Sequence, residues 1–183
     1  MLSSHVKGKV AVFIDAANMF YAERQLGWHI DFQALAHYLY QEMRVVGLYY
    51  YTGVLKENTS QISFLRKLES FGYVLIAKEV KLIQSSNATV KTKGSLDVEL
   101  ALDAYIRRDE YETILLFSGD SDFAYLIDVL KRDGKHAVTI STRGHIAREL
   151  ISRTKYVPLS RLKTHIERSA KIKGPARPAP EVH

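Results

Sequence analysis

The chain has 183 residues, 46% of them hydrophobic and 25% charged, so it is long enough to form about one soluble domain with a full core. It has no cysteine, which excludes a disulfide scaffold, thiolate zinc sites, iron–sulfur clusters and cysteine nucleophiles. Its net charge is +6. The first ten residues lack the apolar stretch of a signal peptide, and no later run is long enough to span a membrane, so we expect a cytoplasmic protein.

Short apolar runs alternate with amphipathic stretches along the chain. The apolar runs are rich in β-branched or aromatic residues, as buried parallel strands are, and cover residues 10–14, 45–51, 73–77, 113–117 and 137–140. Helical spacing of apolar residues covers 32–39, 62–71, 96–106 and 125–130. Asp31 stands where an N-cap is expected, and Gly72 stands where a helix would end. This alternation predicts an α/β domain with a mostly parallel sheet.

Two segments depart from the alternation. Residues 84–94 are polar, carry no acid and are long for a connection, which predicts a functional or disordered loop. Residues 159–173 are expected to form a last basic helix, and the Pro-rich residues 174–183 a disordered tail. Residues 161–183 carry a net charge of +4, so most of the basicity lies in this tail. Such a tail attracts phosphate backbones, but it also serves solubility.

Aspartates follow two of the predicted strands. Asp15 ends the first apolar run, and Asp120 and Asp122 follow the fourth. Open α/β sheets bind ligands beyond the carboxyl ends of their strands, so these acids converge if the two strands are neighbours. Asp97 can join them from the first turn of the helix that follows the polar loop.

Carboxylates a few ångströms apart repel one another, so they must take up protons or hold a cation. Oxygen ligands select hard cations such as Mg²⁺ or Mn²⁺, and the histidines lack the HxxxH or HxH spacing of a zinc site. One or two Mg²⁺ ions would polarise a phosphate and activate a water, which suits hydrolysis of a phosphodiester.

Each of these residues also has a structural interpretation. Asp120 and Asp122 can stabilise the start of the next helix, Asn18 is an N-cap candidate, and Asp97 fits a first helical turn. Asp15 ends a buried strand, where no capping role is expected. Together, acids at two strand ends favour a metal site.

Three segments carry a family resemblance: FIDAAN (13–18), KGSLDVELALD (93–103) and SGDSDF (118–123). They resemble, in order and spacing, the signature of the NYN domain in its LabA-like branch, within the PIN-like nuclease superfamily. The resemblance runs from about Val10 to Leu162.

The resemblance implies a PIN-like three-layer α/β/α sandwich with a central, mostly parallel sheet of five or six strands. It divides the chain into an NYN domain (1–162), a basic helical extension (163–173) and the tail (174–183). It implies an Mg²⁺- or Mn²⁺-dependent endoribonuclease whose acidic pocket holds the metal. That pocket comprises Asp15, Asp97, Asp120 and Asp122, with Asn18 as a polar helper. Lys93 and Asp103 also match positions that commonly hold the same residues in the family. A role in salt bridges would explain these two residues as well.

Candidate RNA contacts lie around the same sheet edge. Lys91 and Lys93 flank the polar loop, as do Lys78 and Lys81, and Arg143 follows the fifth strand, where it can hold a phosphate. Ser118, in the third motif, is a further predicted RNA contact. Residues 49–51 are three tyrosines that offer either a stacking surface or part of the core. Asp103 and Glu99 share a helix face and are either solvated or paired with Arg107.

The favoured function is hydrolysis of single-stranded RNA at the Asp-lined metal site. The alternative is a non-catalytic RNA-binding or regulatory protein that keeps the fold and uses the basic tail. A haloacid-dehalogenase type of phosphatase also places an Asp after its first strand, but it needs a second Asp where this chain has Ala17. PIN-like domains often pair, and the Tyr-rich or C-terminal helical surface offers a homodimer contact.

Overall fold

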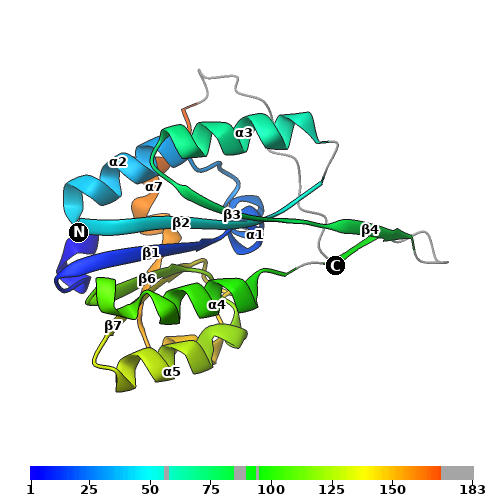
Figure 1. The fold of residues 1–183 in the computed structure, drawn as a ribbon. Coiled ribbons are helices and arrows are strands. Elements are labelled where there is room, and N and C mark those ends of the chain that lie inside the picture. Colours follow the sequence, from blue (N-terminus) through cyan, green and yellow to red (C-terminus); the bar gives the residue numbers. More distant parts are fainter. Residues whose placement is uncertain (56–57, 85–89, 94, 170–183) are drawn as a thin grey trace.

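A six-stranded parallel sheet forms the centre of the computed structural model (Figure 1). The structure describes residues 1–55, 58–84, 90–93 and 95–169, with the backbone alone for 81–84 and 90–93. In spatial order the strands are β3 (Val74–Glu79), β2 (Arg44–Val54), β1 (Lys9–Asp15), β6 (Thr113–Phe117), β7 (His136–Ser141) and β8 (Lys155–Pro158). The predicted five- or six-stranded parallel sheet is therefore confirmed.

Helices cover both faces of this sheet, which confirms the three-layer α/β/α sandwich (Figure 1). One face packs against α1 (Ala16–Leu26), α2 (Phe32–Glu42), α3 (Thr59–Ser70) and α7 (Lys163–Ile166). The other packs against α4 (Asp97–Ile106), α5 (Ala124–Arg132) and α6 (Arg148–Ile151). Successive side chains of a strand point to opposite faces, so Phe13 enters one core and Ile14 the other. Both have no exposed surface, which explains why the strands read as continuous apolar runs.

The predicted helix boundaries have visible physical causes. The Asp31 carboxylate accepts hydrogen bonds from the backbone N–H groups of Gln33 and Ala34, both at 3.0 Å, and so caps α2 as predicted. Gly72 follows α3 with a φ of +91°, a left-handed conformation that glycine adopts without a steric penalty. No helix in the described ranges combines the length and the apolar character that a membrane span requires.

Several segments differ from the sequence prediction. Part of the predicted polar loop is a hairpin, because β4 (Lys81–Gln84) pairs with β5 (Val90–Lys93) in antiparallel register. The helix expected over 159–173 is instead a 3-10 turn (Leu159–Leu162) followed by α7, which ends at Ile166. Ile166 has no exposed surface, and the N–H of Arg168 donates to the carbonyl oxygen of His29 at 2.8 Å. The chain therefore packs onto the domain beyond the predicted boundary at residue 162. Residues 170–173 and the predicted tail lie outside the described residues.

The strand order creates one switch point, between β1 and β6. Strands β1, β2 and β3 follow one another outward on one side, and β6, β7 and β8 on the other. In the register of this pair, Ile14 lies opposite Phe117, so Asp15 and Ser118 leave the sheet side by side. The crevice beyond such a pair is where open α/β sheets bind ligands. The condition under which we expect the acids to converge, that their two strands are neighbours, is therefore met.

Candidate metal centre

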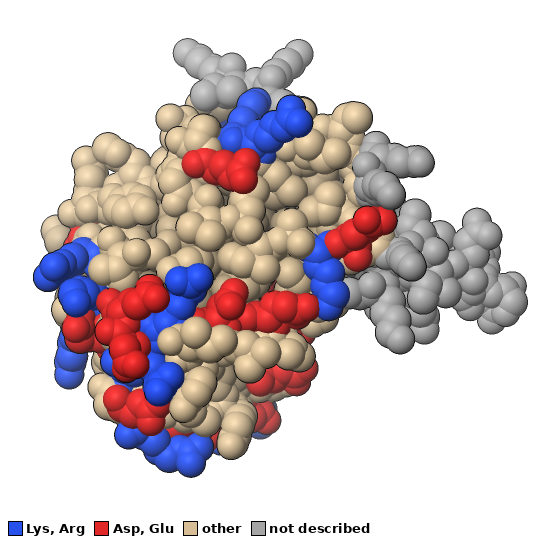
Figure 2. Space-filling view, viewed as in Figure 1, with Lys and Arg blue, Asp and Glu red and all other residues tan. Residues whose placement is uncertain are grey.

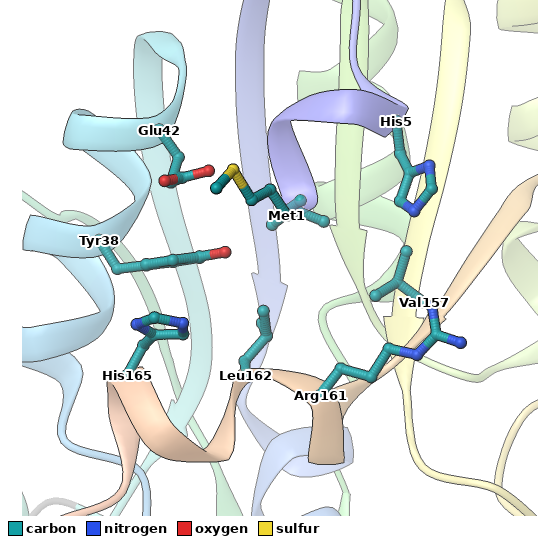
Figure 3. Close-up of a pocket in the computed structure, with 9 residues that line it drawn as sticks. Met1, His5, Tyr38, Glu42, Val157, Arg161, Leu162 and His165 are labelled. Atoms are coloured by element: carbon teal, nitrogen blue, oxygen red, sulfur yellow. The ribbon is translucent and has the colours of Figure 1, made fainter.

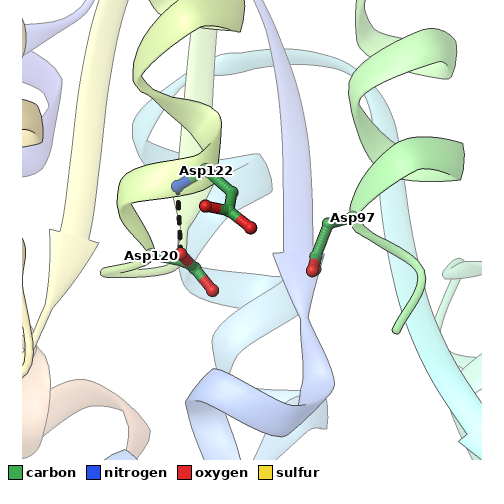
Figure 4. A group of neighbouring side chains, drawn as sticks. All are labelled: Asp97, Asp120 and Asp122. Carbon is green, nitrogen blue, oxygen red and sulfur yellow. Dashed lines mark hydrogen bonds between the residues drawn. The ribbon is translucent and has the colours of Figure 1, made fainter. Parts of the chain in front are cut away.

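Three carboxylates gather beyond this switch point. Asp97, Asp120 and Asp122 each offer one oxygen, and these three oxygens all lie within 4.8 Å of one another (Figure 4). Asp97 is the first residue of α4, whereas Asp120 and Asp122 belong to the turn between β6 and α5. We call these three residues the acidic group. Oxygen donors at this spacing suit a hard divalent cation, so the donor set fits the Mg²⁺ or Mn²⁺ that the sequence predicts.

The electrostatics of the group also favour a cation. Burial raises the pKa of Asp97, and the negative charges of Asp120 and Asp122 raise it further. The hydroxyl of Ser95 donates to the Asp97 carboxylate and partly opposes this shift. Asp122 is exposed and accepts no hydrogen bond from the residues that the structure describes. A bound cation would relieve the repulsion that raises the proton affinity of Asp97.

Asp15 lies behind the acidic group rather than inside it. One oxygen of its carboxylate accepts from the N–H groups of Ala17 (3.0 Å) and Asn18 (3.2 Å), and so caps α1. The other oxygen accepts from the hydroxyl of Ser118 at 3.1 Å. Burial raises the pKa of Asp15 to about 6, and the charge of Asp97 adds to the rise, whereas these hydrogen bonds oppose it. The expectation that Asp15 has no capping role is wrong, because the strand runs directly into a helix.

Ser118 links Asp15 to the acidic group. Its hydroxyl donates to Asp15 and accepts from the backbone N–H of Asp120 at 3.2 Å. Asp120 in turn accepts from the N–H of Asp122 at 3.0 Å, which fixes the turn that carries both acids (Figure 4). Ser118 has no exposed surface, which does not fit the RNA contact predicted for it. We expect it instead to position the carboxylates.

Asn18 and Gly119 hold the ends of β1 and β6 together. The Asn18 side-chain oxygen accepts from the N–H of Gly119 at 2.8 Å and so links the two sides of the switch point. The N-cap of α1 is Asp15, not Asn18. A Cβ atom at Gly119 would lie 2.6 Å from the Ser141 hydroxyl and closer still to the backbone oxygen of His145. Only glycine allows this approach. The apolar pattern of the sequence predicts no role for Gly119 or Ser95, although a glycine directly before an acidic turn is a usable signal.

Comparisons with known proteins agree with this geometry. Residues 9–160 match the NYN domain. The chain belongs to the NYN domain family. It is 36% identical over 166 residues to the low amplitude and bright protein LabA of Synechococcus elongatus, across 88% of this chain and 89% of that one. A crystal structure of a protein of unknown function from Vibrio parahaemolyticus shares the fold with a TM-score of 0.70 and 25% identity, across 87% of this chain and 96% of the other. The predicted LabA-like membership and PIN-like fold are confirmed.

The candidate RNA contacts of this NYN domain come from the turn after β7, from β3 and from β5. Arg143 is exposed in the turn after β7, where its backbone oxygen accepts from the side-chain amide of Gln25 at 2.8 Å. Lys78 forms an ion pair with Glu99, whose carboxylate is 2.6 Å away. Lys91 and Lys93 lie on β5, and their side chains are outside the described part of the chain. Contact with RNA stays a prediction for Arg143 and for both β5 lysines.

The structure also tests the predictions for the tyrosines of β2 and for the acidic residues of α4. Tyr49 and Tyr51 are 5% and 2% exposed, so of the two alternatives the NYN domain uses them as part of the core and not as a stacking surface. The hydroxyl of Tyr51 donates to Asp103 at 2.9 Å. Arg107 does not pair with Asp103 or Glu99, because its guanidinium lies over the Tyr49 ring, 4.9 Å from the centroid, and 3.5 Å from Glu110.

A hollow in the NYN domain lies between the N-terminal 3-10 turn (Leu2–His5), α2 and α7, with a volume of about 220 Å³ (Figure 3). The Tyr38 ring stacks on His165 in its wall, with the ring centroids 4.7 Å apart. Glu42 is the one acid among the described residues that line it, and it accepts a hydrogen bond from Ser3 at 2.8 Å. A single carboxylate does not supply a metal ligand set, so the acidic group remains the candidate site.

Proposed function

We propose that this protein is a metal-dependent ribonuclease that hydrolyses phosphodiester bonds of single-stranded RNA. One observation carries the proposal: carboxylates from α4 and from the β6–α5 turn come within 4.8 Å of one another at the switch point of the sheet. Membership of the NYN family, within the PIN-like nucleases, supports the same activity. In this proposal Asp97, Asp120 and Asp122 hold Mg²⁺ or Mn²⁺. When bound, such an ion supplies positive charge that polarises a phosphate and lowers the pKa of a water molecule.

The remaining residues have supporting roles in the proposal. Asp15 lies behind the acidic group, where it accepts a hydrogen bond from Ser118, whose hydroxyl also accepts from the backbone N–H of Asp120. Ser118 and Asn18 hold the two strand ends in register, so that the acids from distant parts of the chain stay aligned. Arg143 is available at the adjacent strand end to neutralise a phosphate. We expect the protein to act in the cytoplasm.

The decisive experiment compares the wild type with Asp120→Asn on labelled single-stranded RNA, in Mn²⁺, in Mg²⁺ and in chelator. Asparagine keeps the oxygen that caps the turn, so the variant should fold but lose most metal-dependent cleavage. Asp109→Asn is the matched control, because Asp109 is an exposed acid outside the acidic group. Equal cleavage by the wild type and Asp120→Asn would indicate a contaminating nuclease. RNA binding without cleavage would favour the alternative of a non-catalytic RNA-binding protein.

A measurement of metal binding separates the ion from the reaction. Calorimetric titration with Mn²⁺ should give a binding isotherm for the wild type and for Asp109→Asn. The isotherm should be much weaker for Asp120→Asn, because the variant loses one of three charged ligands. Cleavage that persists in chelator would contradict the proposed role of the ion.

A further inference from the structure

Tyr125 is exposed at a position where packing does not explain an aromatic residue. It lies at the start of α5, and 74% of its surface is accessible to solvent. The buried residues of α5 are Leu126, Ile127 and Leu130, on the opposite side of the helix. The Tyr125 ring contacts no other ring, and its hydroxyl makes no hydrogen bond, among the residues that the structure describes. A large ring left in water has no stabilising role in the fold.

Tyr125 lies one helical turn away from the acidic group along the chain. Asp122 precedes it by three residues, and residues three apart on a helical turn share one face. Asp122 is itself the exposed member of the acidic group. The Tyr125 ring therefore stands one turn away from the site proposed to hold the metal, on the solvent side.

Two cations continue this surface along α5. A shallow hollow is lined by Tyr125, Asp128, Lys131 and Arg132. Asp128 is neutralised by Arg153, whose guanidinium nitrogen is 2.9 Å from the carboxylate. Lys131 donates to the backbone oxygen of Arg153, and neither Lys131 nor Arg132 forms an ion pair with a described carboxylate. The hollow thus combines one exposed ring with two uncompensated positive charges.

The neighbouring helix adds apolar surface to the same side of the molecule. Helices α4 and α5 run side by side below the sheet (Figure 1). Val98 and Leu102 on α4 are 68% and 55% exposed, and the space-filling view shows uncharged surface along α4 with acidic side chains beside it (Figure 2). Bases have apolar faces that such a surface accommodates, whereas phosphates need the cations of α5.

We propose that the outer face of α5 binds the single-stranded RNA that leads away from the acidic group, with Tyr125 stacking on a base and Arg132 contacting phosphate. The proposal rests on the RNA substrate proposed above. Arg132 follows Tyr125 by seven positions, which span about 10 Å of helix and correspond to about three stacked nucleotides at roughly 3.4 Å each. Stacking on aromatic rings together with cations along the backbone is how proteins bind single strands without reading their sequence.

The test measures binding of fluorescein-labelled single-stranded RNA by anisotropy in chelator, so that cleavage is absent. Tyr125→Ala should weaken binding roughly 5- to 100-fold, the usual loss for one stacked base, whereas Tyr125→Phe should retain it. Tyr40→Ala is the matched control, since Tyr40 is an exposed tyrosine on α2, which packs on the other face of the sheet. Arg132→Gln should lower the slope of log affinity against log salt by about 0.7, whereas Arg66→Gln on α3 should not.

A second readout reports stacking itself. RNA that carries 2-aminopurine should lose fluorescence on binding to the wild type and to Tyr125→Phe, but not on binding to Tyr125→Ala. Equal affinities for the wild type and Tyr125→Ala would overturn the proposal, even if Mn²⁺-dependent cleavage is found. Loss of affinity in Tyr125→Ala would support it, even if no RNA is cleaved. If instead Tyr125→Ala changes only the sedimentation of a dimer, the face is a contact between copies and the RNA proposal is overturned.

Discussion

Replacing Asp15 by asparagine should make the metal-free protein more stable at neutral pH. Burial raises the pKa of Asp15 from 3.8 to about 6, so at pH 7 the folded state carries a charge that it accommodates poorly. A shift of about two units corresponds to about 3 kcal/mol of unfolding free energy. Asparagine keeps the side-chain oxygen that accepts from Ala17 and Asn18, and its amide can face the Ser118 hydroxyl. The variant therefore removes the charge and keeps the cap.

The raised pKa of Asp15 also predicts how the stability difference between the wild type and Asp15→Asn changes with pH. Well below its ordinary pKa of 3.8, the Asp15 carboxyl is protonated in both the folded and the unfolded state, so ionisation of Asp15 does not affect stability there. As the pH rises from about 4 to above 6, the unfolded state ionises first and the wild type loses stability relative to Asp15→Asn. Urea denaturation in chelator at several pH values between about 2.5 and 8 should show the difference grow from near zero to a plateau of up to about 3 kcal/mol.

Asp31→Asn is the control for this experiment, because Asp31 caps α2 through two similar hydrogen bonds and lies outside the acidic group. A variant at Asp15 that is less stable than the wild type, or a difference that does not change with pH, would refute the reasoning. Addition of Mn²⁺ should stabilise both the wild type and Asp15→Asn, because both keep Asp97, Asp120 and Asp122, and an ion that binds the folded state stabilises it in proportion to the logarithm of its concentration.

Three further predictions concern the fold around the site. Gly119→Ala should lower the free energy of unfolding by about 1–3 kcal/mol in urea titrations and weaken Mn²⁺ binding, because the added Cβ would lie 2.6 Å from the Ser141 hydroxyl. Tyr111→Phe should cost about 1–3 kcal/mol in thermal denaturation, because it leaves the buried carbonyl of Ala104 without the 2.7 Å hydrogen bond that it now accepts. Burial raises the pKa of Tyr73 well above 10.0, so the folded state should lose stability as the pH rises through 10; denaturation between pH 9 and 11 should show a smaller loss for Tyr73→Phe.

The sequence predicts the sheet and the acids well because both follow from burial. Residues 10–14 are covered on both faces, so an unbroken apolar run marks the strand, and an acid can follow only where the strand leaves the core. The edge strand β8 gives no recognisable apolar run because it is four residues long, begins with the exposed Lys155 and ends in Pro158. The hairpin of β4 and β5 carries polar residues that give no apolar pattern.

The hydrogen-bonded partners within the site could not be predicted in the same way. Whether Asp15 caps a helix depends on the backbone turning directly from β1 into α1, which no apolar pattern records. The burial of Ser118 depends on the approach of Gly119 to the turn after β7, a contact between residues far apart in the chain. Local spacing identifies candidate ligands, whereas long-range packing decides which oxygens remain free.

The division of the sheet into two halves has a consequence for the Asp15 carboxylate. The strands β1–β3 and β6–β8 meet through one ladder, between β1 and β6, and Asp15 comes from one side of it whereas Asp120 and Asp122 come from the other. Residues 103 positions apart must therefore pair before Asp15 can accept the hydrogen bond from Ser118, and such non-local pairing is slow to form. Separation of the two halves would break this hydrogen bond and expose Asp15 to water. The raised pKa of Asp15 is thus a property of the joined halves, because burial is its main cause.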